Sequence, residues 1–162
     1  MLESARDEAI VKQQPVAMAL LTSNTDARKV FVALEYVPAT DTAAATWKQI
    51  SRWEPLPSGI VVAATSATDS SLADAFVSNK SPTVATALPK LQYHGTSYNT
   101  PGDYEYLIFM PDGSLYKAAK SYSVSLVEGT WSGSDVQRTG SASNSLQIVI
   151  NDATGRVKVV RP

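Results

Sequence analysis

The sequence predicts an α+β fold in which one N-terminal amphipathic helix packs on mostly antiparallel β-sheet. A helical spacing of apolar residues occurs at the start of the chain, within residues 1–14. β-prone runs joined by short polar turns make up most of the remaining chain. Of the 162 residues, 44% are hydrophobic and 18% are charged, which is typical of a folded domain with a real core.

The helix is predicted from the spacing of its apolar residues and from its charges. Glu8 and Lys12 are placed to form an i,i+4 ion pair, and Pro15 stops the pattern. A free helix of about 12 residues is marginal in water. We therefore expect either that a sheet holds it or that it is the tail of a longer helix. The face expected to pack on the sheet consists of Leu2, Ala5, Ala9 and Ile10.

Three hairpins are predicted from paired β-prone runs. The first joins residues 16–23 to 29–37, and its second run is apolar apart from Glu35, which favours a central strand. The second is predicted around the turn Pro-Asp-Gly at 111–113, and the third around 151–155. Further strands are expected at 60–65 and 122–129. Residues 130–145 are expected to be mostly loop, and so are 65–102, apart from one short helix that could form within 70–80.

Composition excludes several classes of protein. Fourteen basic and fifteen acidic residues give a net charge of −1, which argues against a domain built mainly to coat nucleic acid or an anionic membrane. The chain has no cysteine, so disulfides and thiolate metal sites are excluded. No apolar run approaches the roughly 18 residues of a membrane span. We find no internal repeat and no sign of a second domain, and expect one domain over residues 1–162.

Residues capable of catalysis or metal binding occur without a recognisable motif. His94 is the single histidine and has no serine in a nucleophile-elbow pattern near it, so a loop histidine is the favoured interpretation. Asp103, Asp112 and Asp152 could ligate calcium, but aspartate also favours turns for local reasons, and that interpretation is preferred. No calcium-loop or Gly-rich phosphate motif is present. No cofactor and no metal are expected, and no enzymatic activity.

Two further groups of side chains could bind a partner. Six tyrosines gather between residues 93 and 122, where stacking on sugars or bases competes with ordinary sheet packing, which we favour. Arg156, Lys158 and Arg161 form a basic patch on the last turn and strand. That patch could contact phosphates, or it could protect an edge strand from aggregation; the residues alone favour the second interpretation.

Three stretches in order resemble one family. They are Ala-Arg-Asp-Glu-Ala at 5–9 followed by a strand, Leu-Pro-Ser-Gly-Ile-Val-Val at 56–62 with Leu-Ile-Phe-Met-Pro-Asp-Gly-Ser-Leu at 107–115, and the closing Thr-Gly-Arg-Val-Lys-Val at 154–159. This pattern resembles the soluble domain of the GspH/FimT family of minor pseudopilins and type IV minor pilins. The resemblance implies a pilin-like domain with residues 1–14 as the C-terminal half of a long helix. Residues 15–162 would be the β-rich domain, with a loop insertion at about 65–102.

The resemblance implies a role in assembly. Family members carry a leader and a hydrophobic helix that anchors them as single-pass proteins in the bacterial inner membrane, and prepilin peptidase processes them. The present chain would then lack that helix, and its domain would lie in the periplasm or on an extracellular filament. The implied function is a minor pseudopilin at or near the tip of a type II secretion pseudopilus or type IV pilus. The implied partners are other pilin or pseudopilin subunits, the inner membrane, and secreted cargo or DNA.

Two alternatives stay open. Some FimT-like members resemble DNA receptors for natural transformation and end in a Gly-Arg-x-Arg signature. Here Lys158 replaces the second arginine, which keeps the charge but loses the planar guanidinium. An unrelated secreted enzyme would need a pocket that joins His94 to a carboxylate or a serine.

Overall fold

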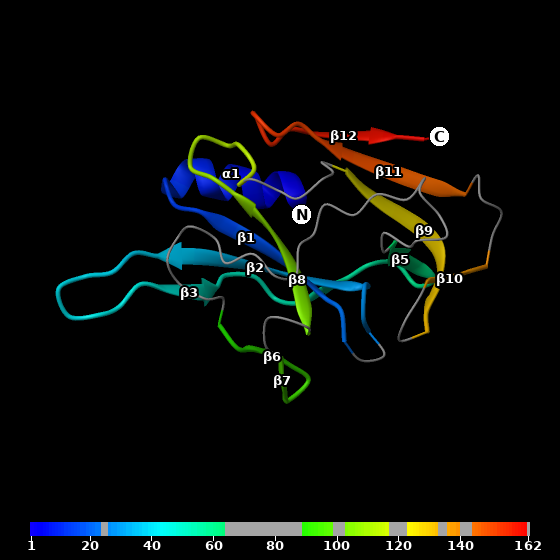
Figure 1. Cartoon of the computed structure of the whole chain (residues 1–162), viewed down its shortest axis with the longest axis horizontal. Coiled ribbons are helices and arrows are strands. Elements are labelled where there is room, and N and C mark those ends of the chain that lie inside the picture. The colour runs from blue at the N-terminus through cyan, green and yellow to red at the C-terminus, as the bar shows by residue number, and fades with distance from the viewer. Residues whose placement is uncertain are drawn as a thin grey trace.

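Strands dominate the computed structural model, which describes residues 1–23, 26–63, 89–98, 103–116, 123–132, 136–139 and 144–161. Strands take 51% and helix 9% of the described residues. The expected α+β, pilin-like class is therefore wrong, and the described chain is mostly β (Figure 1). The physical reason is that one short helix covers only part of a sheet face, and a second sheet covers much of the rest.

The helix α1 (Leu2–Lys12) lies on the first sheet. Ala5 and Ala9 are buried in the core between the helix and the sheet. Leu2, in the first turn of the helix, is partly buried against the same core. Ile10 is half-buried, beside Gly113. The helix ends at Gln13, which takes the left-handed conformation with φ 54° and donates its N–H to the Ile10 carbonyl oxygen. Small buried residues let the helix backbone approach the sheet closely.

The first sheet has the strand order β3-β2-β1-β8, with β4 also paired to β2. The hairpin predicted around residues 24–28 is confirmed, since β1 and β2 pair antiparallel with Met18 opposite Ala33. The apolar run predicted to be central does lie inside the sheet, between β1 and β3. The strands are β1 (Val16–Leu21), β2 (Val30–Val37), β3 (Thr46–Gln49), β4 (Glu54–Pro55) and β8 (Tyr104–Phe109).

The second sheet has the order β10-β9-β11-β12, with β5 also paired to β9. The predicted C-terminal hairpin is confirmed, since β11 and β12 pair antiparallel with Ile150 opposite Val157. The strands are β5 (Ile60–Val62), β9 (Ser123–Trp131), β10 (Val136–Arg138), β11 (Ser145–Ile150) and β12 (Val157–Val160). The prediction of loop was wrong for β10, a three-residue strand that pairs with the end of β9.

A small third sheet interrupts the region predicted as loop at 65–102. β6 (Leu91–Tyr93) and β7 (Thr96–Tyr98) form a hairpin whose turn is His94-Gly95, with φ 47° and 78°. Loop was therefore the wrong prediction for 91–98. The short helix considered within 70–80 lies outside the described residues. The Pro-Asp-Gly turn at 111–113 does reverse the chain, since Phe109 before the turn and Leu115 after it form an isolated antiparallel bridge.

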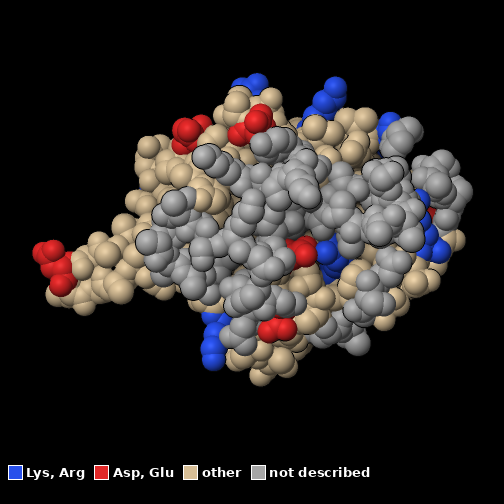
Figure 2. Space-filling view, viewed as in Figure 1, with Lys and Arg blue, Asp and Glu red and all other residues tan. Residues whose placement is uncertain are grey.

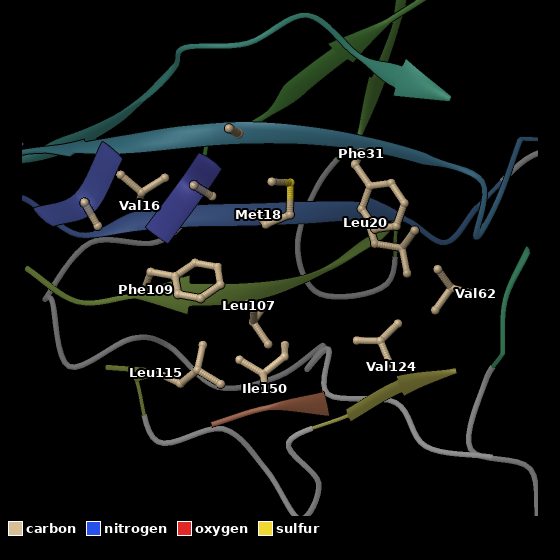
Figure 3. Close-up of a cluster of buried hydrophobic side chains, with 13 residues drawn as sticks. Val16, Met18, Leu20, Phe31, Val62, Leu107, Phe109, Leu115, Val124 and Ile150 are labelled. Atoms are coloured by element: carbon tan, nitrogen blue, oxygen red, sulfur yellow. The ribbon is translucent and has the colours of Figure 1, made fainter. Parts of the chain in front are cut away.

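Both faces of the first sheet are buried. One face packs against α1 and the second sheet, and its cluster includes Met18, Phe109, Val124 and Ile150 (Figure 3). The opposite face packs against the β6–β7 hairpin through Leu91 and Tyr98. This explains why all six residues of β1 are buried and why its sequence lacks polar alternation.

Candidate functional site

Helix α1 meets two turns that are distant from each other in sequence. These turns follow β8, at 110–114, and β11, at 151–155. The Arg6 guanidinium Nε donates to the Thr154 carbonyl oxygen at 2.5 Å. The Leu115 N–H donates to the Asp152 carbonyl oxygen at 2.8 Å. The helix, the first sheet and the second sheet are therefore joined at one place, which we call the helix–turn junction.

Two glycines make the close approach at the junction possible. Gly155 is buried with φ 60°, and a Cβ built on it would overlap the Gly113 carbonyl oxygen. The same Cβ would lie 3.1 Å from Arg6 Cδ and from Phe109 Cδ1. Gly113 has φ 82°, and its Cβ would meet Ile10 Cδ1 at 3.0 Å. Both positions need glycine for the left-handed backbone, and Gly155 also needs it for space.

Ion pairs hold the C-terminal end of α1, and hydrogen bonds hold the Pro-Asp-Gly turn at 111–113. The Lys12 ammonium lies 2.9 Å from both the Glu35 and the Glu8 carboxylates, so the predicted i,i+4 pair is confirmed. Hydrogen bonds to Glu35 first and Glu8 second raise the pKa of Lys12. In the Pro-Asp-Gly turn, hydrogen bonds from the Ser114 hydroxyl and N–H lower the pKa of Asp112. Asp112 thus serves the turn itself.

The basic residues near the C-terminus are exposed but do not share one face. Arg156 and Lys158 alternate with Val157, and Lys158 stands opposite Val149 on the neighbouring strand. Continuing the register by one residue places Arg161 opposite Leu146, and both line the same cavity on the other face of the sheet. Within the ranges that the structure describes, no acidic side chain forms an ion pair with any of the three.

Basic side chains are visible along the edge of the molecule where β12 runs. Figure 2 shows Lys and Arg atoms there, beside a few acidic ones (Figures 1 and 2). Arg156 immediately precedes β12 and Lys158 lies within it. The two could meet a phosphate together, since they are two residues apart along the chain. Arg161 would contact a different ligand from the opposite face.

The other candidates from the sequence are scattered. His94 is exposed in the β6–β7 turn and its ring lies 4.3 Å from that of Tyr93. Asp103 accepts the N–H groups of Thr22 and Ser23 through its backbone carbonyl oxygen. The described segments contain no cluster of three or more histidine, aspartate or glutamate side chains that could hold a metal ion. Neither hydrolytic nor calcium chemistry gains support from these positions.

Most of the described tyrosines pack in the hydrophobic core, which is the interpretation that the sequence favoured. Tyr98, Tyr104 and Tyr106 are buried in the cluster beneath the β6–β7 hairpin, and Tyr122 lies outside the described residues. The Tyr93 hydroxyl donates to the Asp26 carboxylate at 2.9 Å. Burial first, and this hydrogen bond second, raise the pKa of Tyr93 to about 12.

One buried arginine was missed by the reasoning from sequence. Arg28 has φ 61° and an exposed fraction of 5%, although its surroundings in the sequence are typical of a polar loop. Its guanidinium lies 2.9 Å from the Glu105 carboxylate in the first sheet and 5.3 Å from the Trp131 ring centroid in the second. Arg28 therefore bridges the two sheets. The only sequence signal is an opposite charge 77 residues away, which no local pattern identifies.

Comparisons with known proteins give no match: no protein-family model, no curated protein and no solved structure is similar to this chain. The part of the chain that the structure describes contains no helix long and apolar enough to span a membrane.

Proposed function

We propose that this chain is a structural subunit of the GspH/FimT kind, a minor pseudopilin that supports assembly at or near the tip of a type II secretion pseudopilus or a type IV pilus. The proposal starts from the resemblance of its sequence motifs to that family. It assigns the chain a mechanical role and no catalytic one. Other filament subunits would be its partners.

The observation that carries the proposal is the convergence of the motifs in space. The helix motif supplies Arg6, the Pro-Asp-Gly motif supplies Gly113, and the C-terminal motif supplies Gly155. These residues are more than 40 positions apart along the chain, yet all three belong to the helix–turn junction. A shared structural task explains why the three motifs would occur together in one sequence.

The junction suits a subunit that transmits force through its helix. Contacts with Thr154 hold the helix near its first turns, and the ion pair with Glu35 holds its last turn. Buried Ala5 and Ala9 fill the space between. On the opposite face Val11 has an exposed fraction of 80% and is free to meet a neighbouring subunit. A load applied to the helix would therefore pass directly into both sheets.

A genetic test addresses the proposal in the bacterium that encodes the chain. We expect deletion of the gene to reduce protein secretion or filament number, and the wild-type gene to restore it. A gene carrying Gly155→Val should restore less than one carrying Gly95→Val, since only the first disturbs the junction. Unchanged secretion and filament number after deletion would contradict the proposal.

A DNA-binding minor pilin is the second candidate, and the exposure of the basic side chains favours it. Arg156, just before the edge strand β12, and Lys158, within it, are exposed and form no ion pair with an acidic residue in the described ranges. A titration of the domain with duplex DNA at two salt concentrations tests this alternative. Binding that weakens with salt and falls in Arg156→Ala and Lys158→Ala would support it. Absence of binding at low salt would exclude it for this domain.

A further inference from the structure

The second sheet has an open edge along β12. Among the described strands β12 pairs only with β11, and Figure 1 shows it as the outermost ribbon of that sheet. The Asn151 N–H donates to the Arg156 carbonyl oxygen at 2.9 Å, so the ladder continues one pair beyond β12 and that pair is hydrogen-bonded. Hydrogen-bonded and non-hydrogen-bonded pairs alternate along an antiparallel ladder. The backbone N–H and C=O groups of Val157 and Val159 therefore point away from β11, toward the open edge.

The face of the sheet that carries Lys158 is basic at this edge. Lys158 pairs with Val149, and Arg156 shares the face of Lys158 because the two are separated by one residue. Glu128 is the only acidic residue in the described strands of the second sheet. Val149 also pairs with Ser123, and Glu128 lies an odd number of residues beyond Ser123, so its side chain stands on the opposite face. No acidic side chain of these strands therefore neutralises Arg156 and Lys158.

The edge is positive overall and apolar at alternate positions. Its preceding turn carries Asp152, whose carboxylate accepts the Ala153 N–H at 2.9 Å, but three basic residues follow within residues 156–161. Val157 and Val159 alternate with the cations, and Val159 has an exposed fraction of 56%. A second copy of β12 pairing antiparallel would place cations beside cations, which destabilises a sheet. The edge therefore selects a strand of opposite charge.

We propose that β12 binds an extended acidic segment of a partner protein by adding it to the second sheet as a further strand. The backbone of the segment exchanges hydrogen bonds with Val157 and Val159, as in other cases of strand addition. Acidic side chains at alternate positions lie beside Arg156 and Lys158, and β-branched side chains between them extend the face of Val159. The partner is thus defined by alternating acidic and β-branched residues.

Duplex DNA would use the same cations, but it leaves other features of the edge without a role. A phosphate cannot bond to the outward carbonyl oxygens of Val157 and Val159, because it offers no donor, and it gains nothing from an exposed valine. A protein segment uses the backbone, the valines and the cations together. This inference goes beyond the proposed function, because it rests on β12 and not on the family resemblance.

A nuclear magnetic resonance titration of the isotope-labelled chain tests the pairing. The probe is a short capped peptide in which glutamate and valine alternate, and its matched control has lysine in place of glutamate. We expect the glutamate peptide to shift the amide resonances of Val157 and Val159 most. Because the contact is small, we expect a Kd on the order of 0.1–1 mM, and binding should weaken as salt increases. The lysine peptide should not bind.

Two substitutions separate the backbone contribution from the charge. Val159→Pro removes an N–H that faces the open edge and leaves the bonds to β11 in place, a position where edge strands accept proline. It should weaken binding about five-fold, the worth of one hydrogen bond. Val159→Thr keeps both the N–H and the β-branched shape and should bind as the parent chain does. Arg156→Glu combined with Lys158→Glu should exchange the preference, so that the lysine peptide binds instead.

Several results would overturn the inference, once circular dichroism has shown that each variant is folded. They are equal binding of the two peptides, no binding well above the expected Kd, shifts confined to residues away from β12, and binding indifferent to Val159→Pro. Duplex DNA serves as the rival ligand in the same titration. DNA that binds more tightly than the glutamate peptide, with the same affinity for the parent chain and Val159→Pro, would assign the cations to phosphate and also overturn it.

Discussion

Replacing Gly155 with alanine tests the helix–turn junction most sharply. The new Cβ would overlap the Gly113 carbonyl oxygen, so backbone must move to admit it. The left-handed conformation costs a residue with a Cβ about 1–2 kcal/mol. Overpacking adds about 1–3 kcal/mol. We expect the free energy of unfolding to fall by about 3 kcal/mol, and Tm by about 6–12 °C for a domain of this size.

Thermal unfolding followed by circular dichroism measures this loss, with Gly95→Ala as the matched control. Gly95 has a similarly positive φ of 78°, but its Cβ would meet nothing within 4 Å. The control therefore keeps the backbone strain and removes the clash, and should lose only about 1–2 kcal/mol. Equal losses in the two variants would refute the packing role assigned to Gly155. Faster amide exchange in α1, confined to Gly155→Ala, would place the damage at the helix.

Three other predictions concern helix packing, tyrosine ionisation and DNA. Ala9→Leu should lower the free energy of unfolding by about 1–3 kcal/mol through overpacking, whereas Val11→Leu, at an exposed position, should leave it unchanged in the same denaturation assay. Because the pKa of Tyr93 is raised, its contribution to stability is complete below pH 10 and is lost as pH rises through about 12. Ultraviolet titration of Tyr93→Phe should lack one tyrosine that ionises near pH 12, and an unchanged curve would contradict this. If DNA binds, Arg156→Ala and Lys158→Ala should each reduce the salt slope by about 1, and an unchanged slope would exclude phosphate contact there.

Local patterns in the sequence predicted the local structure well. The helix, its Glu8–Lys12 pair and the hairpins at either end of the chain follow from apolar spacing and turn residues within a few positions. The predicted fold class was wrong because the spacing of apolar residues shows which face of a strand is apolar but not which element covers that face. Here a second sheet covers much of the face that a helix was expected to cover.

Three strands, β6, β7 and β10, were missed for reasons of turn chemistry and length. The β6–β7 turn uses His94 where asparagine or aspartate is usual, so the His-Gly pair was not recognised as a hairpin turn. β10 has three residues, too few to show a period of two.

The candidate site was the least predictable part of the molecule. Gly113 and Gly155 were recognised as turn residues, but their contact joins turns that are far apart along the chain. Arg161 was grouped with Arg156 and Lys158 by sequence proximity, and strand alternation places it on the opposite face, where it lines a cavity together with Leu146. Such relations arise from tertiary packing, which a single sequence does not encode locally.

Site-specific photo-crosslinking in the cells that encode the chain tests the proposed assembly role most directly. A photoreactive amino acid at position 11, on the exposed face of α1, should capture another pilin-type subunit that mass spectrometry identifies. A probe at buried position 9 serves as the control and should capture nothing. Failure to capture any pilin-type subunit from position 11, with the protein present at its normal level, would contradict the account.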